Sequence, residues 1–196
     1  MQREPTQWWD EAWSPTIGCT PVSEECDHCY AKTLARRFGG VWGVRPDFGL
    51  TLRPDCMSRP FSWSRTRNVF VCPLSDLFHV EIPDDYIVQA FRVMRACVRH
   101  NFLVLTKRPE RMASFLGTPA LTAMTESDKS GAWPPSNIWL GVTAGNMRRA
   151  NERIPVLLGI GWERNFLSAE PLLEEMRLSP VWFWSVQQRR GLRWVI

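Results

Sequence analysis

Short apolar runs recur along the chain at intervals that suit strands separated by helices. The five clearest runs are Val69–Cys72, Phe102–Thr106, Ile138–Val142, Asn165–Ser168 and Arg193–Ile196. Successive runs start about 27–36 residues apart, which is the length of one strand-plus-helix unit. Because the runs are apolar on both faces, they predict parallel strands that helices cover or surround. Trp13–Ile17 is expected to be a further strand at the start of the series.

The segments between these runs have helical periodicity. Helices are predicted within Asp84–His100, over His28–Phe38 and Pro109–Leu116, and over Asn146–Arg153, where the Ile154–Pro155 step should end the helix. Residues 117–137 carry Gly, Pro, Ser and Thr without clear periodicity and are expected to form a long surface loop. The pattern therefore predicts one α/β domain over residues 1–196, folded as a partial (β/α)6 barrel of parallel strands.

Polar residues follow several of the predicted strands, where barrels of this kind carry their chemistry. We interpret Asp76, His79 and Lys107 as candidate catalytic residues, acting as acid and base or binding an anionic group. The candidate cofactor-binding residues are Ser75, Asp76, Thr143, Asn146, Ser168 and Glu170. For each of them the alternative is structural: a helix cap, a hydrogen-bonded buried histidine or a solvated charge.

Three of the six cysteines cluster in the motif C-x6-C-x2-C, formed by Cys19, Cys26 and Cys29. Three neighbouring thiolates could ligate three irons of a [4Fe-4S] cluster and leave the fourth iron open. A structural zinc site, with His28 or another side chain as the fourth ligand, fits the spacing about equally well. The position of the motif before the first helix of a β/α series favours the cluster.

Composition restricts the protein class and the cellular location but does not identify the reaction. The chain has 196 residues and a formal net charge of +4, and 44% of its residues are hydrophobic, as in a globular protein. No apolar run is long enough to span a membrane, and the N-terminus lacks the order of a secretory signal. We therefore expect a cytoplasmic protein without a membrane partner, whose cysteines are thiols or metal ligands. The excess of arginine over lysine favours nucleic-acid binding only weakly.

The segment WSPTIGCTPVSEECDHCYAKTLARRF resembles the opening of a phage and bacterial protein family with a three-cysteine motif, of radical-SAM-like type. The resemblance continues through FVCPLSDLFH, FLVLTKRPERM, IWLGVT and FLSAEPLL. It implies a radical-SAM-type partial barrel, a [4Fe-4S] cluster on Cys19, Cys26 and Cys29, and S-adenosyl-L-methionine as cofactor. Spore photoproduct lyase, a DNA-repair enzyme, is similar in general type, which brings a nucleic-acid substrate into consideration.

Two departures from the family pattern stand out. Ala144-Gly145-Asn146 replaces a segment that usually carries an acidic residue, and the family's glycine-rich segment after the last strand does not follow Trp194–Ile196. We accordingly expect the fold to lack the segment after the last strand, so that the protein is either a truncated or minimal member of the family or completes its site with a partner chain.

These observations lead to one main hypothesis and two alternatives. The main hypothesis is a radical S-adenosylmethionine enzyme of unknown substrate, with nucleic acid or a nucleotide as the favoured class, in the cytoplasm of a bacterium or phage-infected host. The first alternative is a zinc- or cluster-stabilised phage accessory protein without enzymatic activity. The second is a nucleic-acid-binding module that uses arginine and tryptophan side chains.

Overall fold

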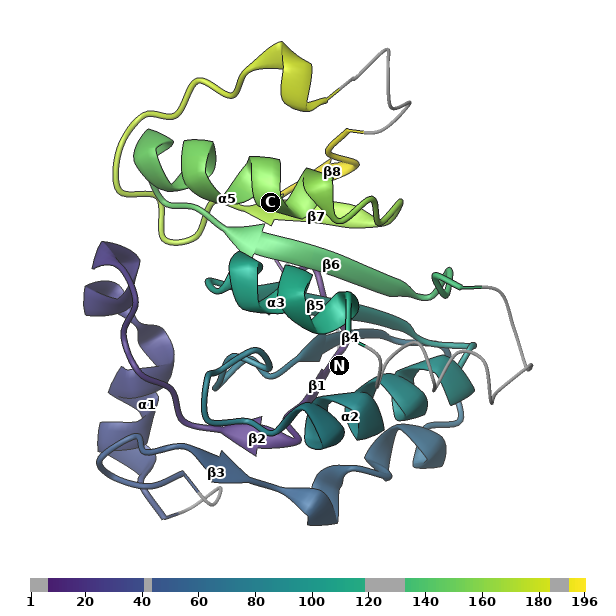
Figure 1. Ribbon diagram of the computed structural model, residues 1–196. Coiled ribbons are helices and arrows are strands. Elements are labelled where there is room, and N and C mark those ends of the chain that lie inside the picture. Colours follow the sequence, from purple (N-terminus) through teal and green to yellow (C-terminus); the bar gives the residue numbers. More distant parts are fainter. Residues whose placement is uncertain (1–6, 41–43, 119–132, 184–190) are drawn as a thin grey trace.

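Six strands pair into one sheet in the computed structural model, which describes residues 7–40, 44–118, 133–183 and 191–196 (Figure 1). In sheet order the strands are β1 (Glu11–Trp13), β4 (Asn68–Val71), β5 (Asn101–Thr106), β6 (Ile138–Thr143), β7 (Asn165–Ser168) and β8 (Trp194–Val195). Every neighbouring pair is parallel. The sheet order follows the chain order, so each new strand is added at the same edge. The predicted parallel α/β architecture is confirmed.

The predicted opening strand near Trp13–Ile17 is confirmed in part: β1 opens the six-stranded sheet but ends at Trp13, and the chain forms a second short strand after it. β1 ends at Trp13, and β2 (Thr16–Ile17) pairs antiparallel with β3 (Thr51–Leu52) in a separate small sheet. Pro15 lies between β1 and β2 and has no N–H to donate to a ladder. Its carbonyl accepts hydrogen bonds from the Arg53 N–H at 2.7 Å and from the Tyr86 hydroxyl at 2.8 Å.

Four α-helices and four short 3-10 helices occupy the connections. They are α1 (Tyr30–Phe38), α2 (Asp84–Ala96), α3 (Pro109–Leu116), α5 (Met147–Gly159), η1 (Glu24–His28), η2 (Pro54–Cys56), η3 (Arg59–Ser62) and η4 (Pro180–Trp182), counted over the described residues. The predicted end of the fourth helix at Pro155 is wrong, since α5 continues to Gly159. Ile154 and Leu157 are fully buried on either side of Pro155, so packing outweighs the lost backbone hydrogen bond. The predicted loop over residues 117–137 lies mostly outside the described residues.

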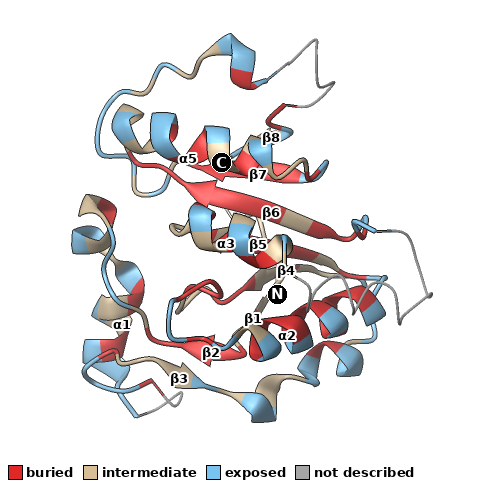
Figure 2. Ribbon diagram, in the orientation of Figure 1, coloured by how far each residue is buried: buried red, intermediate tan, exposed pale blue. Residues whose placement is uncertain are grey.

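Helices α2, α3 and α5 lie along one face of the sheet, and the strands beneath them are largely buried (Figures 1 and 2). The strand side chains on this face alternate along the chain, and with the helices they form the main core: Val69, Val71, Phe102, Val104, Ile138, Leu140, Val142 and Leu167. The opposite face carries the intervening residues Phe70, Leu103 and Phe166, which are not part of that core. The two faces of the sheet are therefore packed differently.

The sheet curls around Trp8 on the face without helices. The Trp8 ring lies 4.7 Å from Phe70 on β4, 5.9 Å from Phe166 on β7 and 6.0 Å from Trp194 on β8. In a flat sheet, β4 and β8 would be roughly 19 Å apart, because neighbouring strands are spaced about 4.8 Å. One indole can contact both strands only because the sheet is strongly curved. No hydrogen-bonded pairing joins β1 to β8 among the described residues, so closure of a barrel is not seen.

A second, smaller core holds α1 and the chain around the cysteines. It consists of Ile17, Ala31, Ala35, Val44 and Phe48, with Cys19, Cys29 and Leu74 packed against it. Figure 1 shows α1, β2 and β3 to one side of the six-stranded sheet. None of the helices in the described part of the chain has the length and apolar character that crossing a membrane requires.

Candidate functional site

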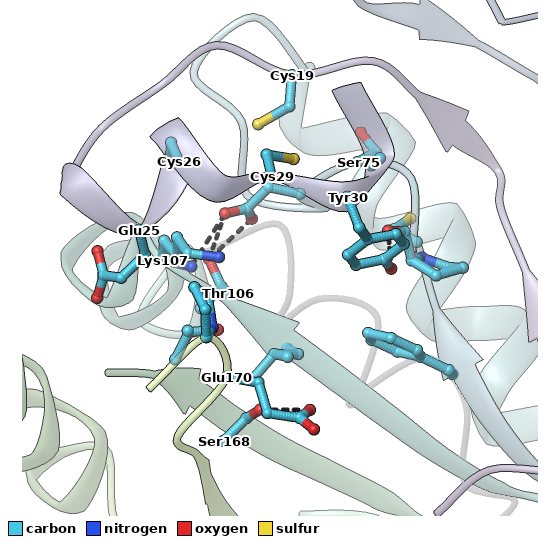
Figure 3. Close-up of a pocket in the computed structure, with 18 of the residues that line it drawn as sticks. Cys19, Glu25, Cys26, Cys29, Tyr30, Ser75, Thr106, Lys107, Ser168 and Glu170 are labelled. Carbon is cyan, nitrogen blue, oxygen red and sulfur yellow. Dashed lines mark hydrogen bonds between the residues drawn. The ribbon is translucent and has the colours of Figure 1, made fainter. Parts of the chain in front are cut away.

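A pocket of ≈ 530 Å³ lies at the carboxyl ends of the parallel strands and extends along the face of the sheet opposite α2, α3 and α5 (Figure 1). Three cysteines of the N-terminal motif line it together with side chains from four strand ends. These lining residues are Cys19, Cys26, Cys29, Ser75, Asp76, Thr106, Lys107, Arg108, Thr143, Ser168 and Glu170. Figure 3 shows the cysteines on one side of the pocket and Ser168 and Glu170 on the other.

The three cysteines are half-buried and come from a short stretch of irregular chain and η1. Cys29 is the N-cap residue of α1, and the Cys26 sulfur accepts the Val22 N–H at 3.5 Å. Burial and the nearby Asp76 carboxylate raise the pKa of Cys19 to about 11, while the Arg108 guanidinium opposes this shift. In the described part of the chain, no three His, Cys, Asp or Glu side chains are close enough to hold a single metal ion.

The segment from Cys19 to Cys29, called the cysteine loop below, is fixed at one end through Thr20. The His79 Nδ1 accepts the Glu81 N–H at 3.2 Å, so the Nε2 carries the proton and donates to the Thr20 hydroxyl at 2.8 Å. The Arg108 Nη2 donates to both the carbonyl and the hydroxyl oxygen of Thr20 at 3.0 Å. Burial and the Arg108 charge lower the pKa of His79, which favours its neutral form. His79 therefore holds the loop and does not line the pocket.

The other end of the loop is fixed through two acidic residues of η1. The Glu25 Oε1 accepts from the Arg153 Nη1 at 3.0 Å and from the Gly145 N–H at 3.1 Å. Burial would raise the pKa of Glu25, but hydrogen bonds and the Arg153 charge lower it below its ordinary value. Glu24 binds Arg149 through Oε2 at 2.6 Å and accepts from Asn146 through Oε1 at 2.6 Å. These contacts join η1 to the start of α5.

Asp76 connects the ends of β4 and β5. Its carboxylate accepts from the Thr106 hydroxyl at 2.8 Å, from the Lys107 N–H at 3.1 Å and from the Phe78 N–H at 3.0 Å. The Arg108 Nη1 lies 3.5 Å from its Oδ2. Asp76 is buried, and its oxygens are engaged within the protein, so the geometry gives it the task of joining two strand ends.

The remaining predicted residues differ in how freely they can bind a ligand. The Lys107 ammonium lines the pocket and has no hydrogen-bond or ion-pair partner among the residues that the structure describes. Glu170 is exposed and accepts from the Ser168 hydroxyl at 3.3 Å. Thr143 is buried in the lining, and the Ser75 hydroxyl donates to the Gly18 carbonyl at 2.7 Å, which supports the turn before Cys19.

Asn146 was predicted to bind the cofactor, but the structure gives it a different role. Its Oδ1 accepts the Arg149 N–H at 2.9 Å and caps α5, while its Nδ2 donates to Glu24. It is not part of the pocket lining. The sequence interpretation missed the contacts between η1 and α5, although Arg149 and Arg153 are spaced i, i+4 on one face of an amphipathic helix.

The wall of the pocket away from the cysteines is apolar and aromatic. Trp8, Trp9, Phe70 and Leu105 line it, and the Trp9 ring lies 6.2 Å from Phe70. Tyr30 also lines the pocket and donates its hydroxyl proton to the Pro73 carbonyl. The pocket thus combines a thiol-rich side, an ammonium without a partner among the described residues, and a wall of aromatic rings tilted against one another.

Comparison with known proteins gives one match. No curated protein and no solved structure matches the chain. A family model described as "Protein of unknown function (DUF5131)" matches residues 3–196. Since this match covers almost the whole sequence, the chain belongs to the DUF5131 family.

Proposed function

We propose that the protein is a radical S-adenosylmethionine enzyme that holds a [4Fe-4S] cluster on Cys19, Cys26 and Cys29. The observation that carries the proposal is that all three cysteines of the C-x6-C-x2-C motif line one pocket at the strand ends. When bound, such a cluster supplies the electron that cleaves S-adenosylmethionine and releases a reactive radical. In this interpretation the curved sheet is the partial barrel of a radical-SAM-type fold.

The donor set fits a cluster better than structural zinc. A zinc ion needs four ligands around one point, and no group of three candidate ligands is gathered in that way among the described residues. Of the side chains considered as a fourth zinc ligand, His79 has both ring nitrogens engaged and Cys56 lies outside the pocket lining, whereas His28 lines the pocket, so zinc stays the alternative that the experiment below separates. A four-iron cluster places each cysteine on a different iron, so its three thiolates stand farther apart than the ligands of a single ion.

The polar side chains of the pocket supply binding groups for the cofactor. The Lys107 ammonium, which has no partner in the described part of the chain, suits a carboxylate, and the exposed Glu170 carboxylate suits hydroxyl or amino groups. Ser75 and Asp76 support the strand ends and the cysteine loop through the hydrogen bonds described above.

The aromatic wall favours a substrate with a planar ring. Trp8, Trp9 and Phe70 provide ring faces in the same pocket as the cysteines. Base–aromatic stacking contributes about 1–3 kcal/mol per base and tolerates different bases. A nucleotide or an unpaired base of a nucleic acid is therefore the substrate class that this wall suits best.

Anaerobic reconstitution with iron and sulfide tests the proposal. We expect a brown protein with absorption near about 400 nm, from thiolate-to-iron charge transfer, and formation of 5′-deoxyadenosine under reduction. The single variants C19A, C26A and C29A should lose both signals. C56A is the matched control, because Cys56 is also half-buried but does not line the pocket, and it should keep both.

The possible results separate the hypotheses. A cluster without cleavage of the cofactor would refute the enzymatic proposal and keep the metal site. A colourless protein that holds one zinc ion would support the zinc-stabilised accessory protein. Nucleic-acid affinity that falls steeply with salt and survives loss of the cysteines would support the binding module.

A further inference from the structure

The Arg108 guanidinium contacts a cysteine of the motif directly. Its Nη1 lies 3.8 Å from the Cys19 sulfur, within reach of an N–H···S hydrogen bond. Its Nη2 donates to two oxygens of Thr20 at 3.0 Å, and its Nη1 lies 3.5 Å from the Asp76 carboxylate. The Arg108 side chain is only 10% exposed, so its position is fixed and its charge is little screened.

We propose that Arg108 raises the reduction potential of the iron–sulfur group at Cys19 by donating a hydrogen bond and positive charge to that sulfur. The inference rests on the proposed function, because it requires a cluster on the motif. Hydrogen bonds to ligand sulfurs and the local net charge are main determinants of cluster potentials. A fixed cation beside a ligand sulfur stabilises the form that carries the extra electron. Arg108 acts through the ligand, and is a positioning residue.

The negative charge of Asp76 opposes the electrostatic effect of Arg108 on the Cys19 sulfur. The Asp76 carboxylate lies 3.5 Å from Arg108 and carries the opposite charge close to Cys19. Hydrogen bonds from the Thr106 hydroxyl, the Lys107 N–H and the Phe78 N–H offset part of the negative charge of this carboxylate. Removing the Asp76 charge should therefore make the cluster easier to reduce, whereas removing the Arg108 charge should make it harder to reduce.

A purely structural role for Arg108 makes a different prediction. Its contacts with Thr20 could simply hold the loop, and His79 shares that task. Thr20→Val removes the hydroxyl that both side chains contact but leaves the guanidinium in the protein. If holding the loop through the Thr20 hydroxyl is the whole effect of Arg108, T20V and R108Q should change the cluster in the same way. The bond to the Thr20 carbonyl persists in T20V, so D76N, which leaves both Thr20 contacts in place, separates the effect of charge from loop support.

A redox titration of the reconstituted full-length chain tests the proposal, with the spectroscopic signal of the reduced cluster as the readout. At the wild-type midpoint potential, the ratio of reduced to oxidised cluster should be about tenfold lower in R108Q than in the wild-type chain. For a one-electron couple this corresponds to a midpoint shift of about 59 mV toward more negative potential. R108K should recover part of the shift, because it keeps the charge without the forked donor geometry. T20V should keep the wild-type midpoint, and D76N should shift it toward more positive potential.

Two results would overturn the inference: a wild-type midpoint in R108Q, or an equal shift in T20V and R108Q. If R108Q does not assemble a cluster, D76N decides, since an unchanged midpoint in D76N also overturns it. Absence of a cluster in the wild-type chain would refute the proposed function itself. If the wild-type chain assembles a cluster but its midpoint potential is unchanged in both R108Q and D76N, only the role of Arg108 is refuted.

Discussion

Replacing Arg153 by methionine should strongly destabilise the protein, because the change leaves a buried carboxylate without its cation. The Arg153 side chain is 5% exposed and that of Glu25 is 0% exposed, and their atoms Nη1 and Oε1 lie 3.0 Å apart. The same guanidinium also donates to the Thr143 carbonyl at 2.7 Å. Breaking one side of a buried ion pair costs about 3–5 kcal/mol. R153M should therefore lose a large share of a stability that is typically about 5–15 kcal/mol.

Urea denaturation of the metal-free protein, followed by circular dichroism, measures this loss. With a slope of about 2 kcal/mol per M, the midpoint should fall by roughly 1.5–2.5 M. R148M is the matched control, since Arg148 is on the same helix but 72% exposed, and its pair with Glu152 should contribute at most about 1 kcal/mol. E25Q combined with R153M should be more stable than R153M alone, because no unpaired charge stays buried. Equal midpoints for R153M and R148M, or strict additivity in the double variant, would refute this reasoning.

Three further predictions concern other parts of the molecule. A Cβ on Gly141 would lie 2.4 Å from the Phe166 ring, so G141A should cost about 1–3 kcal/mol in thermal or urea unfolding; an unchanged stability would contradict the packing described. Burial raises the pKa of Tyr86 to about 12, so its phenol stabilises the fold fully below about pH 10 and this contribution is lost as the pH rises toward 12. In a Y30F background, where Tyr86 is the sole tyrosine, absorbance at high pH should show ionisation near pH 12, and a midpoint near 10 in the folded protein would disprove the shift. K107M should weaken the binding of S-adenosylmethionine to the reconstituted protein about tenfold in equilibrium dialysis, and unchanged affinity would remove Lys107 from the binding site.

Most of the sheet could be predicted because buried parallel strands are continuous apolar runs. The predicted Val69–Cys72 corresponds to β4 at Asn68–Val71, and the predicted Asn165–Ser168 coincides with β7. The errors arose where tertiary contacts overrode a local rule. Pro155 did not end its helix, because the residues around it fill the core. The curvature of the sheet depends on the packing of Trp8 against distant strands, which no local pattern contains.

The candidate site was predictable in its location but only partly in its roles. The motif and the residues after each strand do meet at one pocket, since parallel strands bring their carboxyl ends to the same edge. The direction of a single side chain within a turn is not encoded by periodicity, so His79 and Asn146 were assigned to the site although both hold the cysteine loop. The ion pair of Glu25 with Arg153 joins residues 128 positions apart; the i, i+4 spacing of Arg149 and Arg153 places both on one helix face but does not indicate which acidic residues they contact.

The different packing of the two sheet faces separates folding from chemistry. The helix-covered face contains the main core, whereas Phe70 and Leu105 on the other face border the pocket. Exchanging Leu105 should alter ligand preference at a small thermodynamic penalty, because its side chain is half-buried, whereas Phe70 also packs against Trp8 on the curved sheet. Substitutions along this wall would therefore change what the pocket accepts and leave the helix-covered core in place.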